Sequence, residues 1–320
     1  MDLSASAARP RRTSDILRGV LWFFVSMACF VAMAVAVRDL RDTMNPFEVL
    51  TWRSMVGLLL TLPFVVRGGL RNLHSPNLRI HGVRNTVHFC AQATWVYALM
   101  LLPLVEVTSL EFSIPLFTAI LAPLILKERV GAQRWGAIAL GFVGVLIVLR
   151  PGTGAVSPAA LIMLAGATGY ALSGVLVKLM TRSERASTIV FYMNLMQFPL
   201  GLVSALAVGW TGADWGDAWA ILVLGATGVF AHYAIARGLA LADITILYPL
   251  DFLRLPFMAL IGWLLYAEGM DLWVVVGAVV IFAADLYLVL TGARQARMKA
   301  GENRGAAPPP PNPPPSKGRA

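Results

Sequence analysis

Two opposite charges lie in the middle of an apolar stretch near the end of the chain. The stretch ILYPLDFLRLPFMALIGWLLYAE, residues 246–268, contains Asp251 and Arg254. At a spacing of three residues the two side chains share one face of a helix and can form an ion pair. Ionisable groups inside a membrane face a cavity or one another, because each costs about 2.5–3.5 kcal/mol on insertion scales. Two interpretations stay open: a self-neutralising pair that joins helices, or a solute path in which Arg254 contacts an anionic group and Asp251 a cationic group or a proton.

A row of polar side chains marks another apolar segment, residues 82–101. Asn85, His88, Gln92 and Trp95 recur at spacings of three and four residues, which places them on one face of a helix. His88 titrates near neutral pH when solvated, so proton coupling and a hydrogen bond between helices are both open for it. Further candidates for a solute path, on other apolar segments, are Glu111, His232, Tyr233 and Tyr248.

Motifs for nucleotide hydrolysis and metal binding do not occur in the sequence. There is no GxxxxGK loop, no HExxH and no pair of CxxC motifs, and the four histidines have no metal-ligand spacing. We therefore expect no catalytic residue, no metal and no cofactor. The enzyme alternative is an intramembrane hydrolase that pairs Ser173 with His232, but the local sequence ALSG lacks the glycine expected before such a serine.

Ten apolar segments are long enough to position these residues inside a membrane. The sequence is 58% hydrophobic and 13% charged, and about 20 apolar residues cross a bilayer as a helix. The predicted spans are residues 16–37, 47–66, 82–101, 105–126, 135–149, 159–180, 188–210, 219–241, 244–267 and 272–291. Small residues on the fifth and tenth spans, Gly144 and Gly277 among them, predict close helix contacts. The predicted fold is an all-α integral membrane protein with ten transmembrane helices.

The distribution of charge predicts the topology. Lysine and arginine concentrate before the first span, after the second, fourth and sixth, and after the tenth, whereas the alternate loops are richer in aspartate and glutamate. The positive-inside rule then places both termini in the cytoplasm and accounts for the net charge of +9 without nucleic acid. The expected organisation is a cytoplasmic segment 1–15, a first repeat 16–152, a second repeat 153–292 and a disordered proline-rich cytoplasmic tail 293–320.

An internal repeat relates the two halves. Residues 98–128 align with residues 238–268 at a shift of 140, which places Glu111 on Asp251, Glu128 on Glu268 and Gln92 on His232. The shift covers five spans, an odd number, so the second copy enters the membrane in the opposite direction. Inverted repeats are typical of secondary transporters, in which the solute site lies near the midplane between the halves.

The stretch ALMLLPLVEVTSLEFSIPLFTAILAPLILKERVGAQRWGAIALGFVGVLIVLRPG, residues 98–152, resembles an EamA domain of the drug/metabolite transporter superfamily. The resemblance covers two tandem copies over about residues 16–291. It implies ten helices around a central cavity and the export or uptake of small metabolites.

These observations lead to a functional expectation with one main alternative. We expect a secondary transporter of the bacterial inner membrane, a monomer or a homodimer, that exports a small polar or zwitterionic metabolite of the amino-acid class by alternating access. A gradient of protons or of the substrate itself would drive it. The alternative is an uptake carrier for a larger heteroaromatic compound, such as a riboflavin-like or S-adenosylmethionine-like metabolite, which a mostly aromatic cavity would favour.

Overall fold

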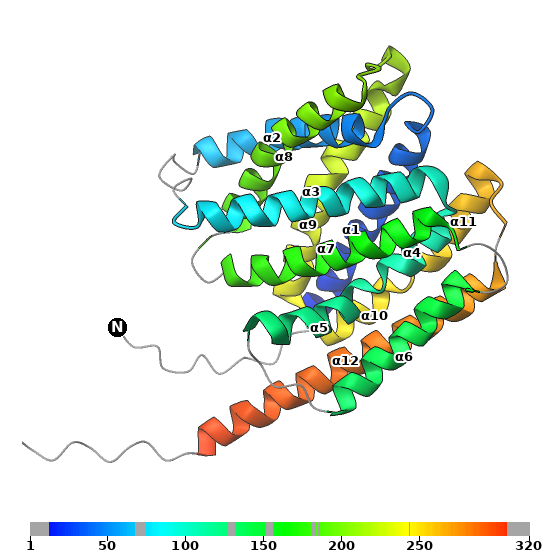
Figure 1. The fold of residues 1–320 in the computed structure, drawn as a ribbon. Helices are drawn as coiled ribbons and strands as arrows, with labels where there is room; N and C mark the ends of the chain where they lie inside the picture. Colours follow the sequence, from blue (N-terminus) through cyan, green and yellow to red (C-terminus); the bar gives the residue numbers. More distant parts are fainter. Residues whose placement is uncertain are drawn as a thin grey trace, which may run out of the picture.

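The computed structural model describes residues 13–67, 75–126, 132–151, 156–180, 184, 186–242, 244–269 and 271–305. These residues form a bundle of helices (Figure 1). The first half contains α1 (Thr13–Asp39), α2 (Pro46–Arg67), α3 (Leu78–Leu101), α4 (Leu104–Glu111), α5 (Ile114–Leu126) and α6 (Ala132–Leu149). The second half contains α7 (Pro158–Met180), α8 (Ala186–Val208), the short 3-10 helix η2 (Trp215–Asp217), α9 (Ala218–Leu241), α10 (Ile244–Asp251), α11 (Arg254–Tyr266) and α12 (Leu272–Gly305).

The predicted repeat is present in the helix boundaries. Helices α9, α10 and α11 each begin and end 140 residues after α3, α4 and α5. The backbone N–H of Leu104, at the start of α4, donates to Glu268 Oε2 just beyond the end of α11, at 2.8 Å. The start of one helix pair therefore lies beside the end of its counterpart, so the two copies run in opposite directions.

Two predicted spans are each divided into two helices. The predicted spans 105–126 and 244–267 are interrupted at residues 112–113 and 252–253, between α4 and α5 and between α10 and α11. Pro115 is the second residue of α5, and Pro256 is the third residue of α11. A proline lacks the backbone N–H and its ring clashes with the carbonyl four residues earlier, which disfavours a continuous helix there. Such discontinuous helices line the solute sites of transporters.

Among the described residues, eight helical spans are long and apolar enough to cross a membrane. Helices α2 and α3 are not among them, so length and composition do not confirm the predicted count of ten. Both helices carry charged and polar side chains that lower their hydropathy, Arg53 on α2 and Arg84 on α3 among them. At the other end of the chain, α12 continues past residue 291 to Gly305, so its backbone is helical in part of the segment that was expected to be a disordered tail.

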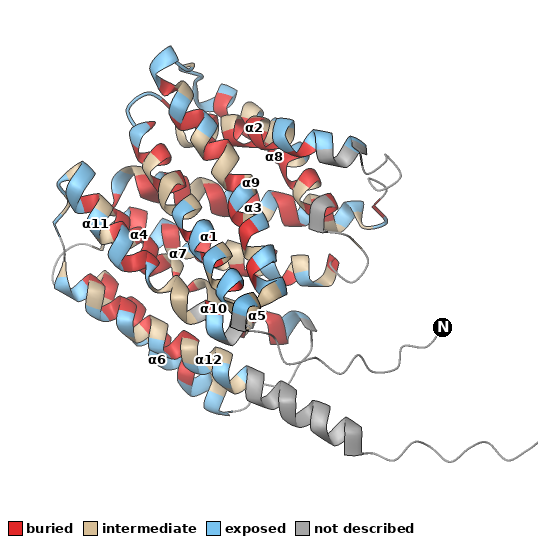
Figure 2. Ribbon diagram, turned by 180° about the vertical axis from the view of Figure 1, so that it is seen from behind, coloured by how far each residue is buried: buried red, intermediate tan, exposed pale blue. Residues whose placement is uncertain are grey.

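The bundle has polar residues inside and large apolar residues outside. Buried polar side chains include Arg53, Asn85, Gln92, Gln197 and Arg254, whereas many leucine, valine and tryptophan side chains are exposed. Figure 2 shows the exposed residues on the outward faces of the helices, such as those of α6 and α12. An apolar outer surface fits lipid tails, and an interior with polar groups fits a solute path.

Glycines allow close contact between the last helices of the two copies. Helices α6 and α12 lie side by side along one edge of the bundle (Figure 1). A Cβ atom on Gly144 would lie 2.7 Å from Ile281 Cγ1 and 2.8 Å from the Gly277 carbonyl oxygen. The backbones are therefore in contact at Gly144 and Gly277, which confirms the prediction from small residues.

A buried carboxylate joins two interhelical segments at the end of the bundle where α3 begins. Glu184, between α7 and α8, accepts hydrogen bonds from Ser75 Oγ at 2.6 Å, Asn77 Nδ2 at 2.9 Å and His81 Nε2 at 2.6 Å. Burial favours the protonated form, but these hydrogen bonds outweigh it and lower the pKa of Glu184 below its ordinary value. The carboxylate therefore holds the start of α3 against the start of α8.

Candidate functional site

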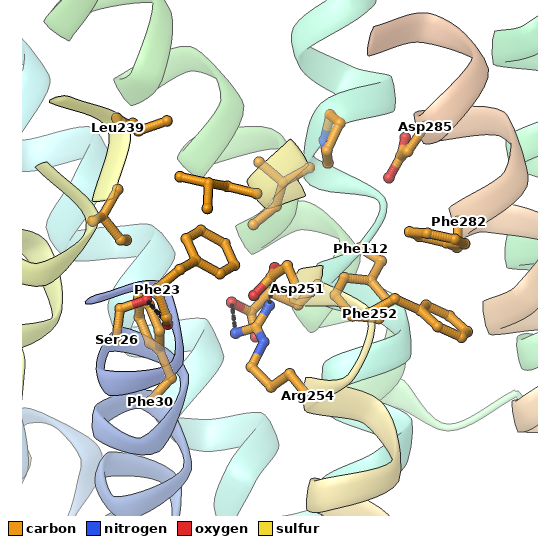
Figure 3. A pocket seen from close by; sticks show the side chains of 15 residues that line it. Phe23, Ser26, Phe30, Phe112, Leu239, Asp251, Phe252, Arg254, Phe282 and Asp285 are labelled. Carbon is orange, nitrogen blue, oxygen red and sulfur yellow. Dashed lines mark hydrogen bonds and ion pairs between the residues drawn. The ribbon is translucent and has the colours of Figure 1, made fainter. Parts of the chain in front are cut away.

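Two adjoining cavities lie between the two copies. The larger has a volume of about 260 Å³ and the smaller about 180 Å³, and Phe30, Glu111 and Ile114 belong to the linings of both. The larger cavity is lined by residues of α1, α9, α10, α11 and α12 and by the break between α4 and α5 (Figure 3). The smaller cavity lies among α1, α2, α3, α7 and α9, and also reaches that break.

Equivalent acidic residues of the two copies meet on one arginine. Glu111 Oε1 accepts a hydrogen bond from Arg254 Nη1 at 2.9 Å, and Asp251 Oδ2 accepts one from Arg254 Nη2 at 3.3 Å. The predicted contact between Asp251 and Arg254 is therefore confirmed. Glu111 is a second carboxylate partner that the sequence analysis did not assign to Arg254. Trp95 Nε1 donates to the remaining oxygen of Glu111 at 3.4 Å.

Aromatic rings surround this ion triad. Phe112 and Phe252, which are also equivalent in the two copies, stack with ring centroids 5.9 Å apart. The Arg254 guanidinium lies 5.3 Å from the ring centre of Phe30 and 5.4 Å from that of Phe112. These distances allow cation–π contacts. Ile114 has the place of Arg254 in the first copy, so the cation occurs at one break and not at the other.

The smaller cavity collects part of the polar row on α3. His88 Nδ1 lies 3.2 Å from Ser173 Oγ, and within the described part of the chain its buried Nε2 has no hydrogen-bond partner. His232 Nδ1 donates to the carbonyl oxygen of Gly228 at 2.8 Å. The hydrolase alternative required Ser173 to contact His232, and the structure places Ser173 on His88 instead.

Most of the predicted site residues line the cavities. Asp251, Arg254 and Glu111 line the larger one, and His88, Gln92, Trp95, His232 and again Glu111 line the smaller. Asn85 is buried against α8, where its Nδ2 donates to the carbonyl oxygen of Tyr192 at 3.3 Å. Tyr233 is 52% exposed and packs edge-on against Trp22, with ring centroids 5.7 Å apart. The side chain of Tyr248 is outside the described residues.

Two charged cavity residues were not predicted as site residues. Arg53 on α2 lines the smaller cavity and Asp285 on α12 lines the larger, and each is 4% exposed. Both are charged residues inside predicted apolar spans, which is the signal that could have identified them. The described residues contain no group of three or more His, Cys, Asp or Glu side chains that could hold a metal ion.

Hydrogen bonds and ion pairs join helix ends of the two copies at one end of the bundle, which we call the Glu268 end. Helices α1, α3 and α11 all stop there. Arg38 donates to the carbonyl oxygen of Leu102 and forms an ion pair with Glu268, with Nη2 and Oε1 2.5 Å apart. Arg150 and Asp271 form a second ion pair. The larger cavity reaches toward the opposite end, because its lining includes residues from the first half of α1 and the last turns of α9.

The EamA-like transporter family matches both copies, at residues 17–150 and 157–290. Similar proteins include an S-adenosylmethionine uptake transporter of Rickettsia prowazekii, 29% identical over 85% of this chain and 92% of its own length. A riboflavin transporter of Brucella anthropi is 32% identical over 74% of this chain and 86% of its own. The pseudopaline exporter CntI of Pseudomonas aeruginosa is 25% identical over 87% of this chain and 98% of its own.

A solved crystal structure shows the same fold. It superposes with a TM-score of 0.60 over 87% of this chain and 98% of its own, at 17% sequence identity.

Proposed function

Because this chain belongs to the EamA-like transporter family, we propose that it is a secondary transporter that carries a heteroaromatic metabolite with polar groups across the bacterial inner membrane. The observation that carries the proposal is the lining of the larger cavity. Phenylalanine is its most frequent residue type, with Phe23, Phe30, Phe112, Phe252 and Phe282. Aromatic side chains in such number provide stacking surface for a planar ring.

The size and chemistry of the cavities support the heteroaromatic class over a small amino acid. Joined at their shared residues, the two cavities reach the lower part of the range of about 300–1,000 Å³ that is usual for ligand pockets. S-adenosylmethionine and riboflavin, which the two relatives' names specify, are both heteroaromatic. The name of the Rickettsia prowazekii relative also supports uptake as the direction.

The closed Glu268 end fits one state of an alternating-access cycle. With ten spans and both termini in the cytoplasm, the Glu268 end faces the periplasm and the larger cavity extends toward the cytoplasm. Transport then requires the Glu268 end to open while the opposite end closes. Candidates for coupling to protons are His88, His232, Glu111 and Asp251, all of which line the cavities.

A second candidate function is export of a small zwitterionic metabolite. The ion triad favours it, because Asp251 and Arg254 present opposite charges to the same cavity. The similarity to the pseudopaline exporter also supports export. Both candidates share the alternating-access mechanism and differ in the size of the solute and in the direction of transport.

Transport by the purified protein in liposomes tests the proposal. We expect saturable uptake of labelled S-adenosylmethionine or riboflavin that empty liposomes do not show. Phe112→Leu should raise the KM by about 2- to 10-fold, because an aromatic contact is worth about 0.5–1.5 kcal/mol. Phe257→Leu, a change on the exposed surface of α11, is the matched control. Transport of amino acids without transport of any heteroaromatic compound would favour the second candidate.

An imposed pH difference across the liposome membrane tests proton coupling. If one of the four candidate residues changes its protonation between states, the pH difference should alter net accumulation. Equal accumulation with and without the pH difference would indicate a facilitator.

Labelling of introduced cysteines tests the orientation of the two copies. Pro76 and Gly216 are exposed and 140 residues apart, just before α3 and α9. We expect an impermeant thiol reagent to modify Pro76→Cys from the cytoplasmic side and Gly216→Cys from the periplasmic side. Modification of both from one side would contradict the proposed topology.

A further inference from the structure

Arg53 of α2 is a buried cation with no acidic partner in the part of the chain that the structure describes. Within the described ranges its guanidinium forms no ion pair, in contrast to Arg254, which contacts two carboxylates. The partner of Arg53 is the side-chain amide of Gln92. With the amide oxygen turned toward α2, this oxygen accepts from Arg53 Nη1 at 2.8 Å and from Nη2 at 3.2 Å. The nitrogen of the same amide donates to Gln197 Oε1 at 2.8 Å. Neutral amides orient the guanidinium but leave its charge uncompensated.

The surroundings of Arg53 favour an anion. Gly228 of α9 packs against the guanidinium, and a Cβ at this position would lie 3.1 Å from Arg53 Nε, so α9 brings no side chain to this point. Arg84, buried on α3, adds a second positive charge on this side of the bundle. Because Arg53 lines the smaller cavity, an anionic group of a bound solute can reach it.

The larger cavity has the opposite balance of charge. Its lining contains three carboxylates, on Glu111, Asp251 and Asp285, and one guanidinium, on Arg254. Asp285 Oδ1 is buried and has no hydrogen-bond partner within the described part of the chain. Figure 3 shows Asp285 projecting from α12 toward the space that Arg254 enters from the other side. A cationic or amino group would compensate this excess of acid.

Aromatic surface connects the two ends. Phe30 belongs to both linings, and Phe112, Phe252 and Phe282 extend the aromatic wall on the side of Asp285. Phe252 and Phe282 stack with centroids 4.3 Å apart. A planar group placed along this wall would have Arg53 at one end and Asp251 and Asp285 at the other.

From this arrangement we infer that the joined cavities bind an amphoteric aromatic solute lengthwise. Arg53 binds its carboxylate or phosphate, the phenylalanines contact its ring system, and Asp251 and Asp285 bind its ammonium or amino group. Arg53 is the residue that determines specificity for the anionic group, because Arg254 is already neutralised by Glu111 and Asp251. The inference rests on the proposed function and specifies the substrate class of the same site.

Competition between a carboxylate-bearing solute and its analogue tests the role of Arg53. In liposomes with the unaltered protein, we expect S-adenosylmethionine to compete for transport roughly 10- to 100-fold better than decarboxylated S-adenosylmethionine, the factor expected for a charge-assisted hydrogen bond. Arg53→Gln should abolish this preference while transport of the decarboxylated analogue continues. Arg79→Gln, the same change at an exposed position of α3, should leave the preference unchanged. Riboflavin and its 5′-phosphate form the corresponding pair for a phosphate, and a preference for the phosphate that Arg53→Gln removes would assign Arg53 to phosphates.

The stability of the empty protein separates a binding role from a structural role. Arg53→Gln removes a buried charge that has no acidic partner within the described residues, so the melting temperature of the empty protein in detergent should stay the same or rise. The rise in melting temperature that S-adenosylmethionine causes should disappear in the same variant. A large fall in the melting temperature of the empty protein, with the preference for the carboxylate retained, would overturn the inference.

A simpler probe keeps the inference testable if the proposed function fails. Absence of heteroaromatic transport by the unaltered protein contradicts the proposed function. The inference is then decided by 4-(aminomethyl)benzoate, which should raise the melting temperature more than 4-(aminomethyl)benzamide does, with the difference lost in Arg53→Gln. Asp285→Asn should likewise remove the preference for 4-(aminomethyl)benzoate over 4-methylbenzoate. Equal effects of the paired compounds on the unaltered protein would overturn the inference.

Discussion

The ion pair between Arg38 and Glu268 should control how often the Glu268 end opens. Glu268 is attached to α11, and it contacts Arg38 of α1 and the backbone N–H of Leu104 at the start of α4. These contacts join the second copy to two helices of the first, so the Glu268 end cannot widen while they persist. We predict that Glu268→Gln shifts the protein toward the state that is open at this end.

The size of the shift follows from burial. The Arg38 side chain is 4% exposed and that of Glu268 is 14% exposed. Removing one partner of a fully buried pair costs about 3–5 kcal/mol, and an exposed pair contributes about 0–1 kcal/mol. For this nearly buried pair we expect Glu268→Gln to destabilise the closed state by about 2–3 kcal/mol relative to the open state. In the closed state Arg38 is left buried without its acidic partner, whereas in the open state it is hydrated. That free energy corresponds to a change of roughly 30- to 150-fold in the equilibrium between closed and open states.

The rate of thiol modification from the Glu268 side measures this equilibrium. Met33, which lines the smaller cavity, is replaced by cysteine in a protein whose own two cysteines have been changed to serine. We expect an impermeant reagent to modify Met33→Cys faster in the Glu268→Gln background by a factor within the range above. The additional change Arg38→Gln should bring the modification rate back toward that of the unaltered background, because no buried charge then remains unpaired. Asp42→Asn, which removes a surface pair with Arg41, is the control, and equal rates in Glu268→Gln and control would refute the reasoning.

Three further predictions concern stability. Gly144→Ala should lower the melting temperature in detergent by an amount equivalent to about 1–3 kcal/mol, because its Cβ would overlap α12, whereas Gly136→Ala, whose Cβ would meet nothing within 4 Å, should not. Glu184→Gln should lower the free energy of unfolding by about 1–3 kcal/mol at neutral pH. Because folding lowers the pKa of Glu184, its contribution to stability is present above the unfolded pKa and is lost as the pH falls. The difference in stability from the unaltered protein should therefore shrink below about pH 4. Arg254→Gln should destabilise the protein by leaving two carboxylates together, and adding Glu111→Gln should restore much of the melting temperature; failure of the second change to help would show that Glu111 is not its buried partner.

The repeat could be predicted from the sequence because the two copies keep matching residues at a constant shift. The alignment of Glu111 with Asp251 fixed the shift of 140, and the structure extends that shift to the ends of three helix pairs. The breaks after α4 and α10 were missed because the apolar pattern continues across them and prolines also occur inside helices of this chain, as Pro123 does in α5. Hydropathy alone therefore cannot distinguish a continuous helix from two helices in line.

The partners of the buried charges could not be derived from one helix at a time. The spacing of Asp251 and Arg254 predicted their contact, whereas the contact of Arg254 with Glu111 spans 143 residues. One clue was available: equivalent residues near the axis of an inverted repeat approach one another, so Glu111 and Asp251 could have been expected to meet. Arg53 had no such clue, because its neutral surroundings depend on which side chains of α3 and α9 face α2.

Two helices that are not among the clear membrane spans bring most of the polar groups to the smaller cavity. Helices α2 and α3 are absent from the eight spans found among the described residues, and they supply Arg53, His88 and Gln92 to that cavity. These polar side chains do not contact lipid, because they are buried inside the bundle. Charged and polar side chains within a membrane helix of this fold therefore indicate a place where the interior is polar, and the search for the residues that select a solute should begin there rather than on the most apolar spans.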